Sequence, residues 1–177
     1  MNTNEELALA ARAQAGERDA LGALWDEITP KLYGYLVNSL REPNLAEDIL
    51  QETWLKAILA LPKFRSRGVK FSAWLFAIAR NECRQHWRRS SREIVEEIKE
   101  ENHPAALDFP ETNLVNRIFV EDLLKTLPEE DREILCLRYT AGLSFKEIAG
   151  VLEITEITAR VRAHRAVARA RKILKDY

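Results

Sequence analysis

The chain has 177 residues, 31% of them charged, with six glycines and six prolines, a composition that suits helices. Its length fits one domain of ordinary size or two small ones. The N-terminus is polar and acidic and no apolar run approaches the length of a membrane span, so we expect neither a signal peptide nor a transmembrane segment. The two cysteines, Cys83 and Cys136, are far apart, which disfavours a disulfide framework and favours a reducing cytoplasm.

The net charge of −1 conceals a strong segregation of charge along the chain. Basic residues dominate from 63 to 92, where Glu82 is the single acid, and again from 155 to 175, where Glu156 is the single acid. Between these blocks, the stretch 93–111 is acidic apart from Lys99. Two basic blocks in a chain of near-zero net charge indicate nucleic-acid contacts that the overall sum hides.

Apolar spacing predicts helices through the first part of the chain. The first covers 4–15, and the second covers 19–40, with Pro30 either kinking it or starting a new helix. A further helix covers 43–61 and turns its apolar rows toward a core. Its other side is polar and carries Glu47, Asp48, Gln51, Glu52 and Lys56. Such a face is usually just solvated, but it also suits docking on the basic helix of a partner.

The stretch 71–89 joins an apolar half to a basic half, and we expect Ser72 to cap its helix. Its apolar residues share one helical face: Phe71, Trp74, Leu75, Ile78 and Ala79. Its basic half carries Arg80, Arg84, Arg88 and Arg89, together with Trp87. This pattern suits nucleic acid held against a folded core, although a solvated basic face fits the stretch equally well. In the basic loop before it, Phe64 is either a core anchor or an exposed aromatic.

The chain changes character at 93–112, which is acidic and interrupted by Pro104 and Pro110. We interpret this stretch as a flexible linker. It divides the chain into a first domain at 1–92 and a second at 113–177.

The second domain reads as a series of helices that ends in a helix-turn-helix. Helices are predicted at 114–126 and 128–139, then after a capping box formed by Ser144 and Glu147, and finally after a Thr155 cap. The apolar residues expected to pack between the last two helices are Val151, Leu152, Ile154, Ile157 and Val161. The last helix carries an arginine stripe suited to phosphates, formed by Arg162, Arg165 and Arg169. Its first turns, where a recognition helix meets base edges, hold Glu156, Thr158, Ala159 and Arg160.

Taken together, these motifs resemble a bacterial RNA polymerase sigma factor of the extracytoplasmic-function (ECF) group. The stretches AEDILQETWLKAI and LPKFRSRGVKFSAWLFAIARNECRQHWRR are similar to sigma region 2. The stretch LKTLPEEDREILCLRYTAGLSFKEIAGVLEITEITARVRAHRA is similar to sigma region 4. The resemblance covers most of the chain in the right order, and it implies an all-α protein of two small helical domains.

The resemblance also implies partners and roles for residues at matching positions. Asp48, Gln51 and Glu52 match the face that binds the clamp helices of the polymerase β′ subunit, and the β flap is a second expected contact. Contacts to the promoter −10 element are implied for Phe64, Arg65, Arg67, Lys70, Arg80, Asn81, Arg84, Gln85, Arg88 and Arg89, with Trp74 as largely buried support. Contacts to the −35 element are implied for Thr155, Glu156, Thr158, Arg160, Arg162, Arg165 and Arg169.

In the last helix, Glu156 and Ile157 replace smaller residues common in the family, and Glu156 is expected either to favour cytosine or to face water. The resemblance further implies an anti-sigma factor and a cytoplasmic location, with attachment to a membrane only through that factor. We expect no enzymatic activity, cofactor or metal, because the chain shows no nucleophile–base pair or phosphate-binding glycine loop, and Cys83 with His86 lacks a second ligand pair. The alternatives are a helix-turn-helix regulator that acts without polymerase and a helical adaptor that binds no DNA.

Overall fold

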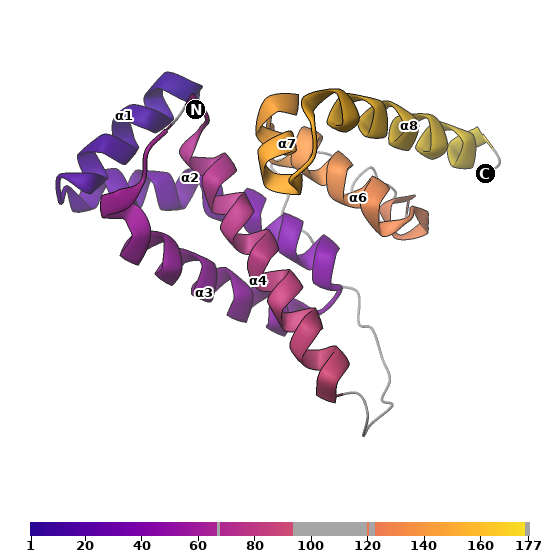
Figure 1. The fold of residues 1–177 in the computed structure, drawn as a ribbon, viewed down its shortest axis with the longest axis horizontal. Helices are drawn as coiled ribbons and strands as arrows, with labels where there is room; N and C mark the ends of the chain where they lie inside the picture. The colour runs from indigo at the N-terminus through magenta and orange to yellow at the C-terminus, as the bar shows by residue number, and fades with distance from the viewer. Residues whose placement is uncertain (67, 94–119, 121–122, 176–177) are drawn as a thin grey trace.

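A computed structural model describes residues 1–66, 68–93, 120 and 123–175 of the chain, and it contains no strand within these ranges. The first domain consists of α1 (Thr3–Gln14), α2 (Arg18–Leu40), α3 (Pro43–Ala60), the short 3₁₀ helix η1 (Leu61–Lys63) and α4 (Phe71–Glu93) (Figure 1). The second consists of α6 (Glu129–Leu135), the π-helical turn η2 (Cys136–Thr140), α7 (Phe145–Leu152) and α8 (Glu156–Lys175). The all-α prediction is confirmed. Nearly all of the predicted linker and most of the predicted helix at 114–126 lie outside the described residues.

The first domain packs its helices around large apolar side chains. Trp54 from α3, Tyr35 and Leu32 from α2, and Phe71 and Phe76 from α4 are almost completely buried. Pro30 neither ends α2 nor starts another helix, since it lies inside one helix that runs from Arg18 to Leu40. None of the described helices combines the length and hydrophobicity that a membrane span requires.

The N-terminus of α4 is capped from another helix rather than by its own Ser72. Glu6, from α1, is buried, and its side-chain carboxylate accepts a hydrogen bond from the backbone N–H of Ser72. The prediction that Ser72 is the N-cap is therefore wrong, because the helix begins one residue earlier, at Phe71. A buried carboxylate at a helix N-terminus satisfies a free N–H group and interacts favourably with the helix dipole.

We expect Glu6→Ala to destabilise the first domain by about 1–2 kcal/mol, since it leaves a buried N–H of α4 without a partner. Urea denaturation followed by circular dichroism measures this change. Glu17→Ala is the matched control, because Glu17 is exposed and, within the described part of the chain, its carboxylate pairs with Arg12, which is also exposed. Equal stability losses in the two variants would contradict the capping role.

The second domain is built around the helix-turn-helix that the sequence predicts. Ser144 and Glu147 form the predicted capping box at α7, and the backbone N–H of Thr158 donates to the Thr155 side chain at 3.1 Å. Both capping predictions are confirmed. The turn between α7 and α8 places Glu153 in a left-handed conformation at φ 58°.

Two apolar residues of α8 do not lie where the sequence pattern placed them. Ile157 is 77% exposed and Val161 is 42% exposed, so they do not pack between the helices. The buried face of α8 is formed instead by Ala159, Ala163 and Ala166. Small side chains let helices approach closely. Ile157 and Val161 each lie two positions from Ala159, so they point to the opposite side of α8.

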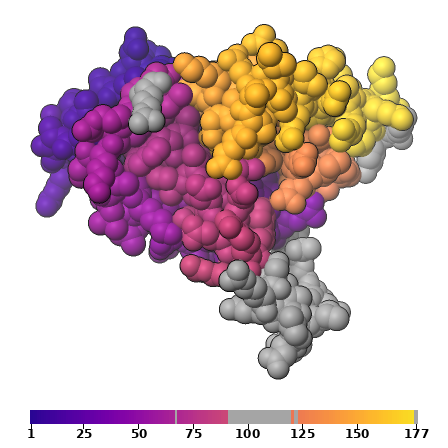
Figure 2. Space-filling view, in the orientation of Figure 1, coloured from indigo at the N-terminus to yellow at the C-terminus, as the bar shows by residue number. Residues whose placement is uncertain are grey.

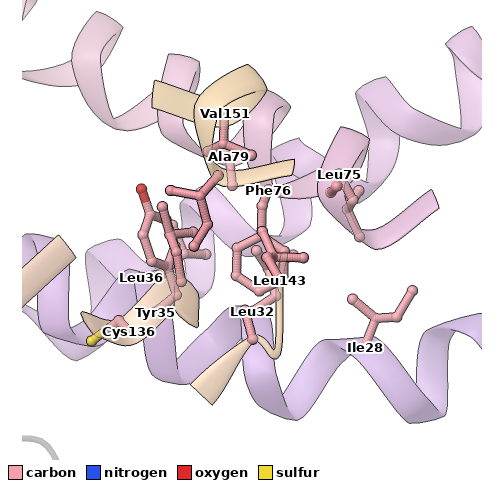
Figure 3. Packing of buried hydrophobic residues seen from close by; sticks show 14 of the residues in the cluster. Ile28, Leu32, Tyr35, Leu36, Leu75, Phe76, Ala79, Cys136, Leu143 and Val151 are labelled. Carbon is pink, nitrogen blue, oxygen red and sulfur yellow. The ribbon is translucent and has the colours of Figure 1, made fainter. Parts of the chain in front are cut away.

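The two domains lie directly against each other. α4 packs on α7, and α2 packs on α6 and η2. Figure 2 shows the second domain, in orange and yellow, seated against the magenta surface of α4. Close up, Phe76 and Ala79 of α4 gather with Leu143 and Val151 of the second domain (Figure 3). One apolar cluster therefore spans both domains.

Both cysteines are buried in this cluster and free. Burial, aided by nearby Glu133, raises the pKa of Cys83 to about 12, and burial likewise raises the pKa of Cys136 to about 12. Folding therefore favours the protonated thiols, and this contribution to stability is lost as the pH rises above the pKa of an unfolded cysteine, near 9.

We expect neither cysteine to react with dithionitrobenzoate at pH 8 in the folded chain, because both thiols are buried and their raised pKa keeps them protonated. Both should react in guanidinium chloride. The absorbance of the released thionitrobenzoate gives the number of reactive cysteines in the folded and in the denatured chain. Rapid modification of either thiol without denaturant would show that the domains open far more often than this packing implies.

Candidate nucleic-acid and polymerase interfaces

The loop between α3 and α4 is held in one shape from several sides. The side-chain amide of Gln14, on α1, donates to the backbone carbonyls of Leu61 and Phe64 at 2.8 and 2.9 Å. Within the loop, the Ser66 hydroxyl bonds the backbone of Val69 and Gly68. Gly68 has φ 78°, a left-handed conformation that glycine adopts without strain. The sequence analysis missed Gln14, which lies far from the loop in the chain.

An open pocket of about 420 Å³ lies beside this loop, lined by Phe64, Ser66, Val69 and Trp74, among others. Phe64 is only 7% exposed, and its ring lies 4.9 Å from that of Trp74 and 5.4 Å from that of Phe71. Phe64 is thus a core anchor that also forms a wall of the pocket. Trp74 is partly buried beside it, in keeping with its expected supporting role. The pocket is large enough to hold one planar aromatic group.

The arginines at the centre of α4 contact the second domain. The Nε of Arg80 donates to Oε1 of Glu133 at 2.9 Å, and the Tyr35 hydroxyl donates to the same oxygen at 3.1 Å. Burial, together with the Glu133 charge, raises the pKa of Tyr35 well above its usual value, so the phenol stays protonated as a donor. One helical turn on, Nη1 of Arg84 lies 3.2 Å from Oε2 of Glu153.

The other predicted −10 residues are distributed unevenly around this interface. Asn81, Arg88, Arg89 and Arg65 are exposed, and Gln85 is half-buried. The backbone N–H of Lys70 donates to Oε1 of Glu147, at the N-terminus of α7, at 3.1 Å. Arg67 lies outside the described residues. Of the predicted −10 residues, Lys70, Arg80 and Arg84 thus contact the second domain, whereas Arg65, Arg88 and Arg89 are exposed.

The polar face of α3 is accessible. Asp48 and Gln51 are exposed, while the carboxylate of Glu52 lies 3.1 Å from Nζ of Lys56. The same face continues into Leu55 and Leu59, which are 53% and 72% exposed. Sequence analysis missed these two leucines, although their spacing of seven and eleven residues from Asp48 places them in the same helical row.

The arginines of α8 are partly engaged within their own domain. Arg169 lies 2.6 Å from Asp131 and Arg162 lies 3.8 Å from Glu130, and both acids belong to α6. Arg160 pairs with Glu156 at 3.0 Å, one turn earlier on α8. The remaining predicted residue of the stripe, Arg165, is exposed.

A second, apolar pocket of about 320 Å³ lies on the other side of α8. Its lining includes Val120, Leu124, Leu127, Tyr139, Val167 and Leu174. Tyr139, in the π-helical turn, is 69% exposed at its edge. Sequence analysis missed this pocket because its walls come from segments that are distant in the chain. Among the described residues, no group of three or more histidine, cysteine or acidic side chains is placed to hold a metal ion.

Comparison with known proteins shows the family. The family model for Sigma-70 region 2 matches residues 24–93, and that for Sigma-70, region 4 matches residues 120–169. The chain is 34% identical over 180 residues to the ECF RNA polymerase sigma factor SigD of Mycobacterium tuberculosis, an alignment that covers 96% of this chain and 82% of SigD. The chain belongs to the ECF group of the sigma-70 family.

Other sigma factors show the same likeness. The chain is 32% identical to the ECF sigma factor BldN of Streptomyces coelicolor over 95% of its own length, but it spans only 65% of BldN. Its fold is similar to the sigma factor RpoE of Bartonella quintana, solved in complex with the anti-sigma factor NepR, with a TM-score of 0.72 and 25% identity over 88% of this chain and 96% of RpoE. In this ECF chain, the region 2 match includes α3, the loop pocket and α4, and the region 4 match includes α6, α7 and most of α8.

Proposed function

We propose that this ECF-group chain binds core RNA polymerase and directs it to promoters that carry a −10 and a −35 element. The observation that carries the proposal is the pocket of about 420 Å³ that is lined by the aromatic side chains of Phe64 and Trp74 and by the basic residues Lys63 and Arg65. A helix-turn-helix alone would bind duplex DNA, and it would need no such pocket on a separate domain. A pocket with aromatic walls and a cationic rim suits a single base turned out of the helix.

At the −10 element, each part of this surface has a role in strand separation. The pocket takes up a flipped base, and Arg65 and Lys70 hold the backbone at its rim. Arg80, Asn81, Arg84 and Gln85 contact neighbouring bases, while Arg88 and Arg89 bind phosphates further along α4. Base capture offsets the unstacking that melting requires, because each aromatic–base contact contributes about 1–3 kcal/mol.

DNA binding by α4 requires the two domains to separate. The Arg80 guanidinium that would contact a base donates to Glu133, and the Arg84 guanidinium lies against Glu153. The N–H groups that donate to these carboxylates cannot donate to DNA at the same time, and the second domain covers the side of α4 that it contacts. The closed arrangement and the −10 complex therefore compete for the same side chains.

Core polymerase binding uses two further surfaces. The α3 face binds the clamp helices of β′ through Asp48, Gln51 and Glu52, with Leu55 and Leu59 as an apolar extension. The apolar pocket beside α8 suits an apolar helix, and we assign it to the β flap. An anti-sigma factor would restrain the free chain, and the bacterial cytoplasm, where the polymerase works, is its place of action.

The experiment that tests the function is transcription of fragmented genomic DNA by purified core polymerase with and without the chain, followed by sequencing of the transcript ends. We expect transcripts that start downstream of one shared two-part motif and that require the chain. Core binding without such transcripts, or transcripts without a shared motif, would overturn promoter recognition. A chain that binds duplex DNA but not core polymerase would be the helix-turn-helix regulator instead.

A further inference from the structure

Two apolar side chains stand uncovered at the start of α8. Ile157 and Val161 are one helical turn apart, at 77% and 42% exposure, so they share one face. α8 runs along the outer edge of the molecule in Figure 1, and neither residue belongs to the apolar cluster that joins the domains. Exposed β-branched residues side by side at the start of a recognition helix suggest a ligand with apolar groups.

The polar residues around this pair are engaged with one another. The hydroxyls of Thr155 and Thr158 lie 2.8 Å apart and share a hydrogen bond. Glu156 accepts a hydrogen bond from Arg160, whose guanidinium also lies 5.5 Å from the centre of the Phe145 ring. Reading bases through these polar groups would break bonds that already exist, whereas an apolar contact to Ile157 or Val161 would break none.

The ligand must also carry negative charge around its apolar groups. Arg160 lies between Ile157 and Val161 in the sequence, Arg162 and Arg165 follow Val161 along α8, and all three arginines are at least partly exposed. The major groove of DNA matches this arrangement, because thymine presents a methyl group there and phosphates line both edges. Valine and isoleucine also have one strongly preferred χ1 rotamer in a helix, so they lose little side-chain entropy on binding.

We infer that Ile157 and Val161 recognise the 5-methyl groups of thymines in the −35 element. The inference rests on the proposed function, since it requires α8 to lie in the major groove. It gives this chain a −35 preference set by methyl contacts at the start of α8. Of the two alternatives for Glu156, it favours the one in which this side chain faces water, where its carboxylate accepts a hydrogen bond from Arg160.

The test uses holoenzyme and the promoter found by transcription, with each −35 thymine replaced in turn by deoxyuridine. This change removes one methyl group and leaves every hydrogen-bonding group in place. We expect promoter affinity of the wild-type holoenzyme to fall about fourfold at one or two positions, the effect of losing one buried methyl group. In holoenzyme made with Ile157→Ala, deoxyuridine should have no effect at the thymine that Ile157 contacts. In holoenzyme made with Val161→Ala, deoxyuridine should have no effect at the thymine that Val161 contacts.

Two controls accompany these combined changes in DNA and protein. Deoxyuridine in the spacer between the two elements should leave affinity unchanged, and Ile157→Val should retain most of the methyl effect. The inference is overturned if no −35 thymine responds to methyl removal, if the response is undiminished in both alanine variants, or if the −35 element contains no thymine. A protein partner on this face would leave the promoter affinity of Ile157→Ala unchanged, which also overturns it. Failure of the wild-type chain to direct any transcription would instead refute the proposed function, and this inference with it.

Discussion

Asp48→Lys is expected to weaken binding to core RNA polymerase by about one to two orders of magnitude, because it reverses a charge that would face the clamp helices of the β′ subunit. Asp48 is exposed on α3, and no ion pair between residues that the structure describes involves it, so the substitution should leave folding intact. The measurement is fluorescence anisotropy of labelled chain titrated with core polymerase. Stability in urea should match that of the wild type.

Asp26→Lys is the matched control for this effect. Asp26 is also exposed, but it lies on α2 and is not part of the polar face of α3 that carries Asp48. The two variants have the same net charge, so they differ only in where the lysine lies. The loss for Asp48→Lys should shrink as salt rises, since salt screens charge pairs at a surface. Equal losses in both variants would refute the α3 face as the polymerase contact.

The double variant Glu133→Gln/Glu153→Gln is expected to open the chain and expose its −10 surface. It removes the carboxylate charges that hold Arg80 and Arg84. We expect the free chain to bind single-stranded −10 DNA about tenfold more tightly, since a mostly buried ion pair with an additional hydrogen bond contributes more than an exposed one. Small-angle scattering should show a larger radius of gyration, while circular dichroism should stay that of the wild type.

The matched control is Glu130→Gln/Glu156→Gln. Glu130 lies on α6, as Glu133 does, and Glu156 is the first residue of α8, just after the turn that contains Glu153. Both control carboxylates contact arginines within the second domain, Arg162 and Arg160. This control should change neither the radius of gyration nor the affinity for single-stranded −10 DNA. Tighter binding in the control, or none in the test variant, would show that the Arg80 and Arg84 contacts do not limit access to α4.

Local signals in the sequence were sufficient for most helix positions. The capping box of Ser144 and Glu147 and the Thr155 cap join residues three positions apart, so a pattern along the chain contains all the information. Apolar spacing likewise located the core face of α4, because helical periodicity fixes which residues share a face. The resemblance of two long motifs then indicated the family, which the comparisons confirm.

Contacts between distant segments decided the rest. Glu6 caps α4 from 66 residues away, and Gln14 holds the loop before it, so neither role leaves a local pattern. Ile157 and Val161 fit an apolar helical pattern as well as the alanines do. Only the close packing of α8 on α6 and α7 selects the small residues for the interior and leaves the larger ones outside.

By itself, the sequence determined an all-α chain with two basic surfaces and the order of its helices, because those properties depend on composition and short-range periodicity. The tertiary structure decided which charges are available, because pairing depends on distance in space. Arg80 and Arg84 are equivalent to Arg88 and Arg89 in sequence pattern, yet the first two face Glu133 and Glu153 across the domain interface. The same folding that assembles the −10 surface therefore also covers its centre.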